Sequence, residues 1–320
     1  MQLSEFKFCD FTTKPQSVKN LFGIDWDITI PVFQEKNLLI PDIDPHYIFN
    51  ADVTKSIIAG FLYNRRVLLQ GLHGTGKSTH IEQVAARLNW PCVRINFDGH
   101  IMRSDLLGKD IIRIENGHPV SFYQPGILPW SLKNPIALIL DEYDAARPEV
   151  LFVLQRLLEQ EGKLMLLDEN LILTPHRYFR LFATLNTLGL GDSTGLYFGT
   201  HPINQGQLDR WNLIAHLSYF SFEKEMELIK AKVPSLNIPE FQDTIKSMIA
   251  FADLTRQGFK NGDLSLPMSP RCLISWGENI NIFKNVEEAL RLSFLNRFSE
   301  EDQKLLIEYY DRAFETSKLS

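Results

Sequence analysis

The chain has 320 residues and a mass of 36.9 kDa, with 33 basic and 39 acidic side chains and a formal net charge of −6. Residues 1–50, 51–220 and 221–320 contribute −3, 0 and −3 to that charge. Because no segment is basic, we do not expect the chain to bind a nucleic-acid backbone through bulk electrostatics. The length predicts one large domain and a smaller one rather than a single core.

The three cysteines, Cys9, Cys92 and Cys272, are scattered and lack CxxC spacing. This pattern argues against a disulfide framework or a structural zinc site and favours a reducing compartment. The N-terminus lacks the basic flank and apolar stretch of a signal peptide, and apolar runs such as residues 136–140 are too short to cross a bilayer. We therefore expect a soluble protein of the cytoplasm.

Residues 1–50 contain four prolines that interrupt any long helix, and we expect an ordered arm or linker there. A helix is predicted over residues 51–63, a short strand over 67–69, and an amphipathic helix after a glycine-rich loop. Further strands are predicted at residues 93–97, 136–140, 180–184 and 213–217. A helix with Pro148 near its first turn is predicted between the strands at 136–140 and 180–184. Strands alternating with helices predict a largely parallel five-stranded α/β sheet with helices on both faces.

Two strand–turn–strand patterns interrupt this alternation. The first is centred on Asn116-Gly117, a pair that suits a type I′ hairpin turn, and the second runs from residue 163 to 174. After residue 221 the pattern becomes helical, with helices predicted at residues 222–232, 239–257, 285–297 and 300–317. Arg271 is expected to open a helix of this last segment.

A phosphate-binding loop is predicted between the first strand of the sheet and the helix that follows it. Its sequence is Gly71-Leu72-His73-Gly74-Thr75-Gly76-Lys77-Ser78-Thr79, which has the Gly-x-x-x-x-Gly-Lys-Ser spacing. The glycines let backbone N–H groups point at phosphate oxygens, Lys77 can reach the β- and γ-phosphates, and the Ser78 hydroxyl can bind Mg²⁺. The alternative is a glycine-rich turn without a ligand.

Two carboxylates, Asp141 and Glu142, follow the apolar strand at residues 136–140. This is the Walker B arrangement, in which Asp141 would hold Mg²⁺ through water and Glu142 would polarise the attacking water. A solvated strand end is the alternative for such a pair. Their position downstream of a phosphate-binding loop favours the functional interpretation.

Three further polar residues are candidates for the same site. Asn186 follows the strand at residues 180–184 and could orient the lytic water, or could satisfy its own turn. Arg210 could stabilise charge on the γ-phosphate in the transition state, or could pair with Asp209. Arg271 could contact the nucleotide from the helical segment. The eight histidines form no HxxxH or HExxH pair, and no nucleophile motif is present.

Together these features resemble an AAA+ ATPase, and the two hairpins resemble the helix-2 insert and pre-sensor-1 hairpin of the MoxR and magnesium-chelatase branch. Longer stretches are similar to the CobS-type ATPase subunit of aerobic cobaltochelatase from about residue 20 to the C-terminus. These stretches are residues 22–25, 70–83, 89–96, 141–144, 189–192, 194–197 and 268–271. Leu72 stands where this family is expected to have an aromatic residue.

The resemblance implies an AAA+ P-loop core over residues 51–220, a helical lid over 221–320 and an N-terminal arm over 1–50. It implies a hexameric ring with ATP and Mg²⁺ between neighbouring subunits. The residues that would act within their own subunit are Lys77, Ser78, Asp141, Glu142 and Asn186. Arg210 resembles the arginine finger that acts on the neighbouring subunit, and Arg271 resembles sensor 2, on its own subunit or across the interface.

The implied partners are an integrin-like chelatase subunit and a very large subunit that binds the tetrapyrrole and cobalt. ATP hydrolysis would drive Co²⁺ insertion into hydrogenobyrinic acid a,c-diamide. A MoxR-like chaperone that remodels or metallates another protein would use the same motor, because ATPase motifs do not identify the client. A nucleotide-binding scaffold is a weaker hypothesis, and the charge distribution disfavours a DNA or RNA translocase.

Overall fold

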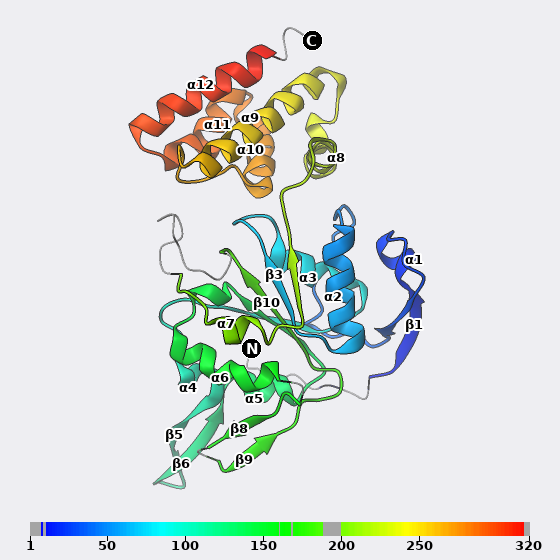
Figure 1. The fold of residues 1–320 in the computed structure, drawn as a ribbon, viewed down its shortest axis with the longest axis vertical. Helices are drawn as coiled ribbons and strands as arrows, with labels where there is room; N and C mark the ends of the chain where they lie inside the picture. Colours follow the sequence, from blue (N-terminus) through cyan, green and yellow to red (C-terminus); the bar gives the residue numbers. More distant parts are fainter. Residues whose placement is uncertain (1–7, 9–10, 160, 168, 188–199, 317–320) are drawn as a thin grey trace.

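Five parallel strands form the central sheet in the computed structural model, which describes residues 8, 11–159, 161–167, 169–187 and 200–316 (Figure 1). In spatial order these strands are β11 (Leu213–His216), β3 (Val67–Gln70), β10 (Arg180–Leu185), β7 (Ala137–Asp141) and β4 (Cys92–Asn96). Each neighbouring pair is parallel, which confirms the predicted sheet. β7 and β10 are buried along their whole length, because both faces of the sheet are covered.

Successive strand residues point to opposite faces and so contribute to two separate apolar cores. In β7, Leu138 and Leu140 belong to one core and Ala137 and Ile139 to the other. Helices α4, α5 and α6 contribute to the first core, and α2 and α3 to the second. These helices are α2 (Ala51–Tyr63), α3 (Lys77–Arg87), α4 (Arg103–Leu107), α5 (Ile127–Leu132) and α6 (Pro148–Leu158).

The N-terminal segment is an ordered antiparallel ribbon. It consists of β1 (Thr13–Ser17) and β2 (Thr29–Phe33), with the short helix α1 (Val18–Phe22) between them. The Phe33 ring is fully buried and lies 4.5 Å from the ring of Trp90, centroid to centroid. The ribbon therefore packs into the same core as α2 and α3.

Both predicted hairpins are present and project from the end of the α/β region that lies away from the C-terminal helices (Figure 1). The first pairs β5 (Gly108–Glu115) with β6 (His118–Pro125), and the second pairs β8 (Leu164–Leu166) with β9 (Leu171–Leu173). Asn116 and Gly117 have φ of 51° and 81°. Positive φ at both central residues is what a type I′ turn requires, which confirms that prediction.

The described residues after β11 form helices joined by loops and no strand, as predicted, and they have their own apolar core around Phe251 and Trp276. The helix that Arg271 was expected to open is α10; the Ser269 side chain caps this helix and Pro270 occupies its first turn. The helices are α8 (Phe222–Lys232), α9 (Gln242–Asn261), α10 (Pro270–Phe283), α11 (Val286–Ser293) and α12 (Glu300–Thr316).

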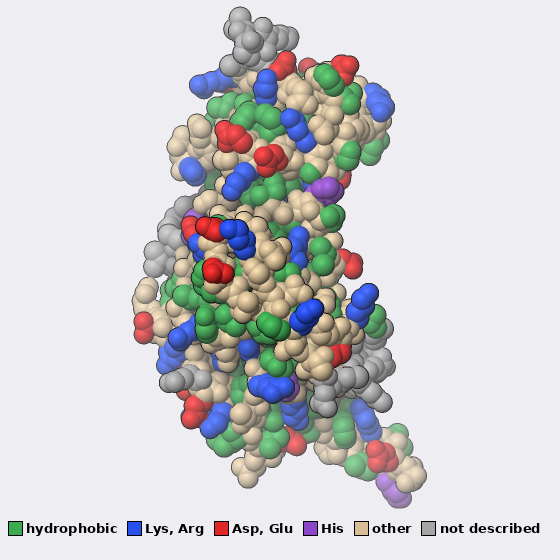
Figure 2. Space-filling view, turned by 90° about the vertical axis from the view of Figure 1, so that its right-hand side faces the viewer, with side chains coloured by type: hydrophobic (Ala, Val, Ile, Leu, Met, Phe, Trp, Pro, Cys, Tyr) green, Lys and Arg blue, Asp and Glu red, His purple; other side chains and the backbone are tan. Residues whose placement is uncertain are grey.

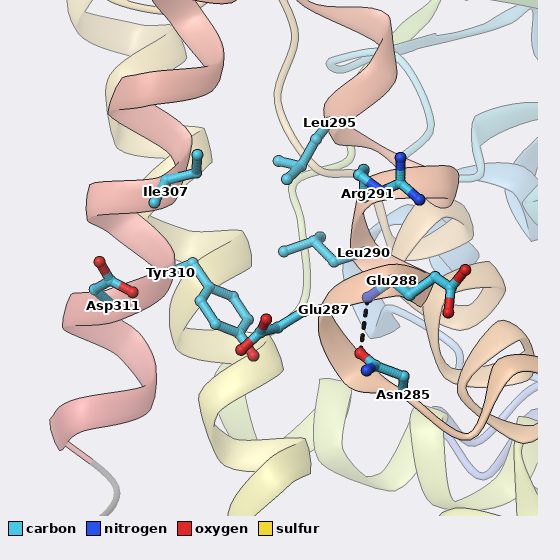
Figure 3. Close-up of a pocket in the computed structure, with 9 residues that line it drawn as sticks. All are labelled: Asn285, Glu287, Glu288, Leu290, Arg291, Leu295, Ile307, Tyr310 and Asp311. Atoms are coloured by element: carbon cyan, nitrogen blue, oxygen red, sulfur yellow. Dashed lines mark hydrogen bonds between the residues drawn. The ribbon is translucent and has the colours of Figure 1, made fainter.

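Two surface features concern possible ligands. On the face shown in Figure 2, basic and acidic side chains are interspersed over both parts of the molecule. An open cavity of about 430 Å³ lies between α11 and α12 (Figure 3). Its apolar lining is Leu290, Leu295, Ile307 and Tyr310, and its acidic lining is Glu287, Glu288 and Asp311. Its lining residues all belong to the C-terminal helices, so it is separate from the site described next.

Candidate nucleotide-binding site

The loop between β3 and α3 has the backbone geometry of an anion cradle. Gly74 and Gly76 have φ of 76° and 88°, and Gly76 is the N-cap of α3. A Cβ atom at Gly71 would lie 2.2 Å from the carbonyl oxygen of Leu217, so a side chain is excluded there. The first N–H groups of a helix have no partner within the helix, so the start of α3 favours an anion at this position.

Lys77 is buried at the base of this loop. Its Nζ donates to the carbonyl oxygens of Gly71 (2.7 Å) and Leu72 (3.1 Å) and to Oδ1 of Asn186 (2.9 Å). Burial lowers the pKa of Lys77 to about 8. Lys77, which is predicted to bind phosphate, and Asn186, whose amide is predicted to orient the attacking water, are therefore in direct contact.

Asp141 at the end of β7 is surrounded by hydroxyl groups. Ser78 and Thr184 both donate hydrogen bonds to its Oδ1, and Nε of Arg94 lies 3.4 Å from its Oδ2. Carboxylate and hydroxyl oxygens are the ligands that Mg²⁺ takes in proteins, so Ser78 and Asp141 fit the predicted magnesium site. Among the residues that the structure describes, no group of three or more His, Cys, Asp or Glu side chains could hold another metal ion.

Glu142 has a left-handed backbone conformation, with φ of 55°. For a residue other than glycine this conformation costs about 1–2 kcal/mol, and such outliers cluster at functional sites. The Glu142 N–H donates to Oγ1 of Thr184 (3.1 Å), which secures the turn. The turn places Glu142 at the rim of the same cavity as Lys77.

Asp144 is a site residue to which sequence reasoning assigned no role. Its side chain is fully buried, and its Oδ2 accepts hydrogen bonds from the N–H groups of Asn186 (3.1 Å) and Thr187 (2.9 Å) and from the Thr187 hydroxyl (2.8 Å). Asp144 thereby fixes the two residues that follow β10, Asn186 and Thr187. The sequence signal was a third carboxylate in the run 141–144, but its burial follows only from the tertiary fold.

Most of the predicted loop residues, together with Asp141, Glu142 and Asn186, surround one cavity of about 310 Å³. Gly71 and Thr75 do not line it, and Thr75 lines an adjoining cavity instead. Arg271 of the same chain also lines this cavity, from the first turn of α10. The full lining is His73, Gly74, Gly76, Lys77, Ser78, Thr79, Arg94, Asn96, Asp141, Glu142, Asn186 and Arg271.

Arg210 does not line this cavity. It donates to the carbonyl oxygen of Gly206, and the Gln155 amide, turned so that its oxygen faces the guanidinium, accepts from both terminal nitrogens at 3.0 Å. Its described partners are thus Gly206 and Gln155 rather than Asp209. The glycine-rich stretch at residues 189–197 lies outside the described residues, as does Cys9.

A second cavity, of about 460 Å³, adjoins the first and shares Gly74, Gly76, Thr79 and Arg271 with it. Its remaining walls come from segments far apart in the sequence, including Tyr47, Ile48, Phe220, Leu228 and Ile274. Aromatic and aliphatic walls beside an anion cradle suit a flat heterocycle attached to phosphates. This cavity could not be predicted from the sequence, because no local motif connects its walls.

No helix in the described part of the chain is both long and apolar enough to span a membrane. Residues 66–197 match the family described as "AAA domain (dynein-related subfamily)". The RuvB Holliday junction branch migration motor of Thermotoga maritima is a structural neighbour, with a TM-score of 0.48, 16% identity, and coverage of 79% of this chain and 72% of that one.

Two curated relatives are similar in sequence. Midasin of Dictyostelium discoideum is 29% identical over 83% of this chain but only 4% of its own length. The aerobic cobaltochelatase subunit CobS of Sinorhizobium sp is 51% identical over 93% of this chain and 90% of its own length. Since that similarity covers both the AAA+ P-loop core and the helical segment, the chain belongs to the CobS family of aerobic cobaltochelatase subunits.

Proposed function

We propose that this chain is the ATP-hydrolysing subunit of a cobaltochelatase, which couples ATP turnover to insertion of Co²⁺ into hydrogenobyrinic acid a,c-diamide in aerobic cobalamin biosynthesis. The observation that carries the proposal is 51% identity to a cobaltochelatase subunit over 93% of the chain. The cavity that gathers Lys77, Asp141 and Glu142 supports the ATPase part of the proposal.

Most of the predicted site residues that line the cavity have a proposed role in ATP hydrolysis. The loop N–H groups and Lys77 bind the β- and γ-phosphates, while Asn186 and Glu142 orient and deprotonate the attacking water. Ser78 and Asp141 would hold Mg²⁺. When bound, that ion would supply positive charge beside the phosphates. Arg271 neutralises the γ-phosphate from the lid.

We further propose that residues 51–220 and 221–320 act as a nucleotide-binding domain and a lid in a homo-hexameric ring, with residues 1–50 as an arm. Arg210 would then complete the nucleotide site of the neighbouring subunit. This is consistent with its absence from the residues that line the nucleotide cavity of its own subunit. The proposed partners are an integrin-like subunit and a large subunit that binds cobalt and the tetrapyrrole. The free thiols of Cys92 and Cys272 suit a cytoplasmic location.

The test is Glu142→Gln in an assay reconstituted with both partner subunits. The variant is expected to bind ATP, to lose ATP turnover by a hundredfold or more, as loss of a general base costs, and to insert no cobalt. Glu149→Gln, the same change on an exposed part of α6, is the control. Full cobalt insertion by Glu142→Gln would refute the motor role. An affinity pull-down separates the two functions: recovery of an unrelated integrin-like partner, without any effect on cobalt insertion, would favour the chaperone.

A further inference from the structure

Tyr219 lies on the chain segment that connects the sheet to the helical lid, between β11 and α8 (Figure 1). Its hydroxyl donates a hydrogen bond of 3.1 Å to the carbonyl oxygen of His73, inside the phosphate-binding loop. On the lid side, the guanidinium carbon of Arg256 lies 4.3 Å from the centroid of the Tyr219 ring, a distance typical of a cation–π contact. Tyr219 therefore contacts the loop and the lid at the same time.

Arg256 is buried and uses its whole guanidinium. Its two terminal nitrogens bind both carboxylate oxygens of Glu225 on α8, at 3.0 and 2.7 Å. Its Nε donates to the carbonyl oxygen of Met268 (2.9 Å), while the Met268 N–H donates to the hydroxyl of Thr255 (3.0 Å). Both backbone polar groups of Met268 are thus held by consecutive residues of α9. A forked, buried arrangement of this kind leaves little freedom to either partner.

Met268 directly precedes Ser269, the N-cap of α10, and Arg271 lies in the first turn of that helix. Fixing Met268 therefore fixes where Arg271 enters the nucleotide cavity. Ser269 itself packs directly against the phosphate-binding loop. A Cβ atom at Gly74 would lie only 2.4 Å from Cβ of Ser269. The loop and the start of α10 are packed without space for one methyl group.

We infer that Arg256 and Tyr219 are positioning residues that couple the phosphate-binding loop to Arg271, so that the loop and the lid arginine adopt their working positions together. Arg256 holds the peptide before Arg271 on one side and the ring of Tyr219 on the other, and Tyr219 holds the loop carbonyl of His73. This inference rests on the proposed ATPase activity. It assigns no contact with the nucleotide to either residue.

The test is a double-mutant cycle between Tyr219→Phe and Arg271→Ala. Tyr219→Phe keeps the ring that Arg256 covers and removes the hydroxyl bond to His73. Because one partly exposed hydrogen bond is lost, we expect kcat/KM for ATP to fall about two- to fivefold. In the Arg271→Ala background the same change is expected to have no further effect, since there is then no arginine to position. Tyr63→Phe, the same change at an exposed tyrosine of α2, is the control.

Two results would overturn the inference: a Tyr219→Phe variant with wild-type kcat/KM, or an equal loss in both backgrounds, as a purely structural role would give. If the wild-type chain binds a fluorescent ATP analogue but hydrolyses no ATP, the proposed function fails. The cycle is then run on the dissociation constant of that analogue, with the same expected non-additivity. Arg256→Lys, which keeps the charge but loses the fork, is expected to lower kcat/KM at least as much as Tyr219→Phe while Arg271 is present.

Discussion

Lys77 provides a stability prediction that does not depend on ATP turnover. Burial lowers the pKa of Lys77 from 10.5 to about 8 in the folded chain. Between these values the unfolded chain binds more protons, so the free energy of unfolding rises with pH. The penalty for burying the ammonium is fully present below pH 8 and is lost as the pH rises to 10.5. At 1.36 kcal/mol per pKa unit, it amounts to about 3 kcal/mol.

The perturbation is Lys77→Met, which removes the titrating group and keeps most of the side-chain volume. Urea unfolding of wild type and variant at pH 7.5 and 10.5 would give the difference in unfolding free energy, read from midpoints at equal slope. We expect that difference to shift by about 3 kcal/mol in favour of wild type at the higher pH. Lys224→Met, at an exposed position of α8, serves as the control. A difference that is independent of pH, or that shifts the other way, would refute the reasoning.

Two further predictions concern residues around the cavity. Asp144→Ala leaves two backbone N–H groups without their acceptor and should lower the unfolding free energy by about 2–5 kcal/mol. Asp144→Asn keeps an acceptor oxygen and should lower it by about 1 kcal/mol. Equal urea midpoints for the two variants would contradict this prediction. Arg210→Ala and Glu142→Gln are each expected to abolish ATP turnover, and an equimolar mixture should regain roughly a quarter of it, because one random subunit interface in four is then intact. A mixture as inactive as its components would argue against action on the neighbouring subunit.

The phosphate-binding loop could be predicted from sequence because its parts are contiguous. A strand, a loop with glycines at fixed positions and an amphipathic helix occupy fewer than 25 successive residues, from β3 to α3. The strand before Asp141 was equally visible, since β7 is buried on both faces and its sequence is a continuous apolar run. The Asn116-Gly117 turn followed from local backbone preference alone. In each case the physical cause acts over a few residues.

The remaining parts of the site depend on contacts between distant segments. Asp144 looks like any polar residue after a strand until the fold buries it beneath the loop that follows β10. The apolar cavity needs Tyr47, from the stretch between β2 and α2, and Ile274, from α10, to meet beside Gly74. Arg256 looks like a surface residue of an amphipathic helix, yet Glu225 neutralises it in the interior. The helix that Arg271 was expected to open is α10, and its start is indicated by the cap residues before Arg271 rather than by helix periodicity.

Strand order explains why Asn186 is central to the site. β10 lies between β3 and β7, so the loop after β10 is adjacent both to the phosphate-binding loop and to the acidic turn after β7. The Asn186 side chain accepts from Lys77 while its backbone N–H donates to Asp144, so one residue joins the two motifs. Tyr219 and Ser269 contact the same phosphate-binding loop at His73 and Gly74. The phosphate-binding loop is therefore connected in two directions, to the acidic turn through Asn186 and to the start of α10, which carries Arg271, through Tyr219 and Ser269.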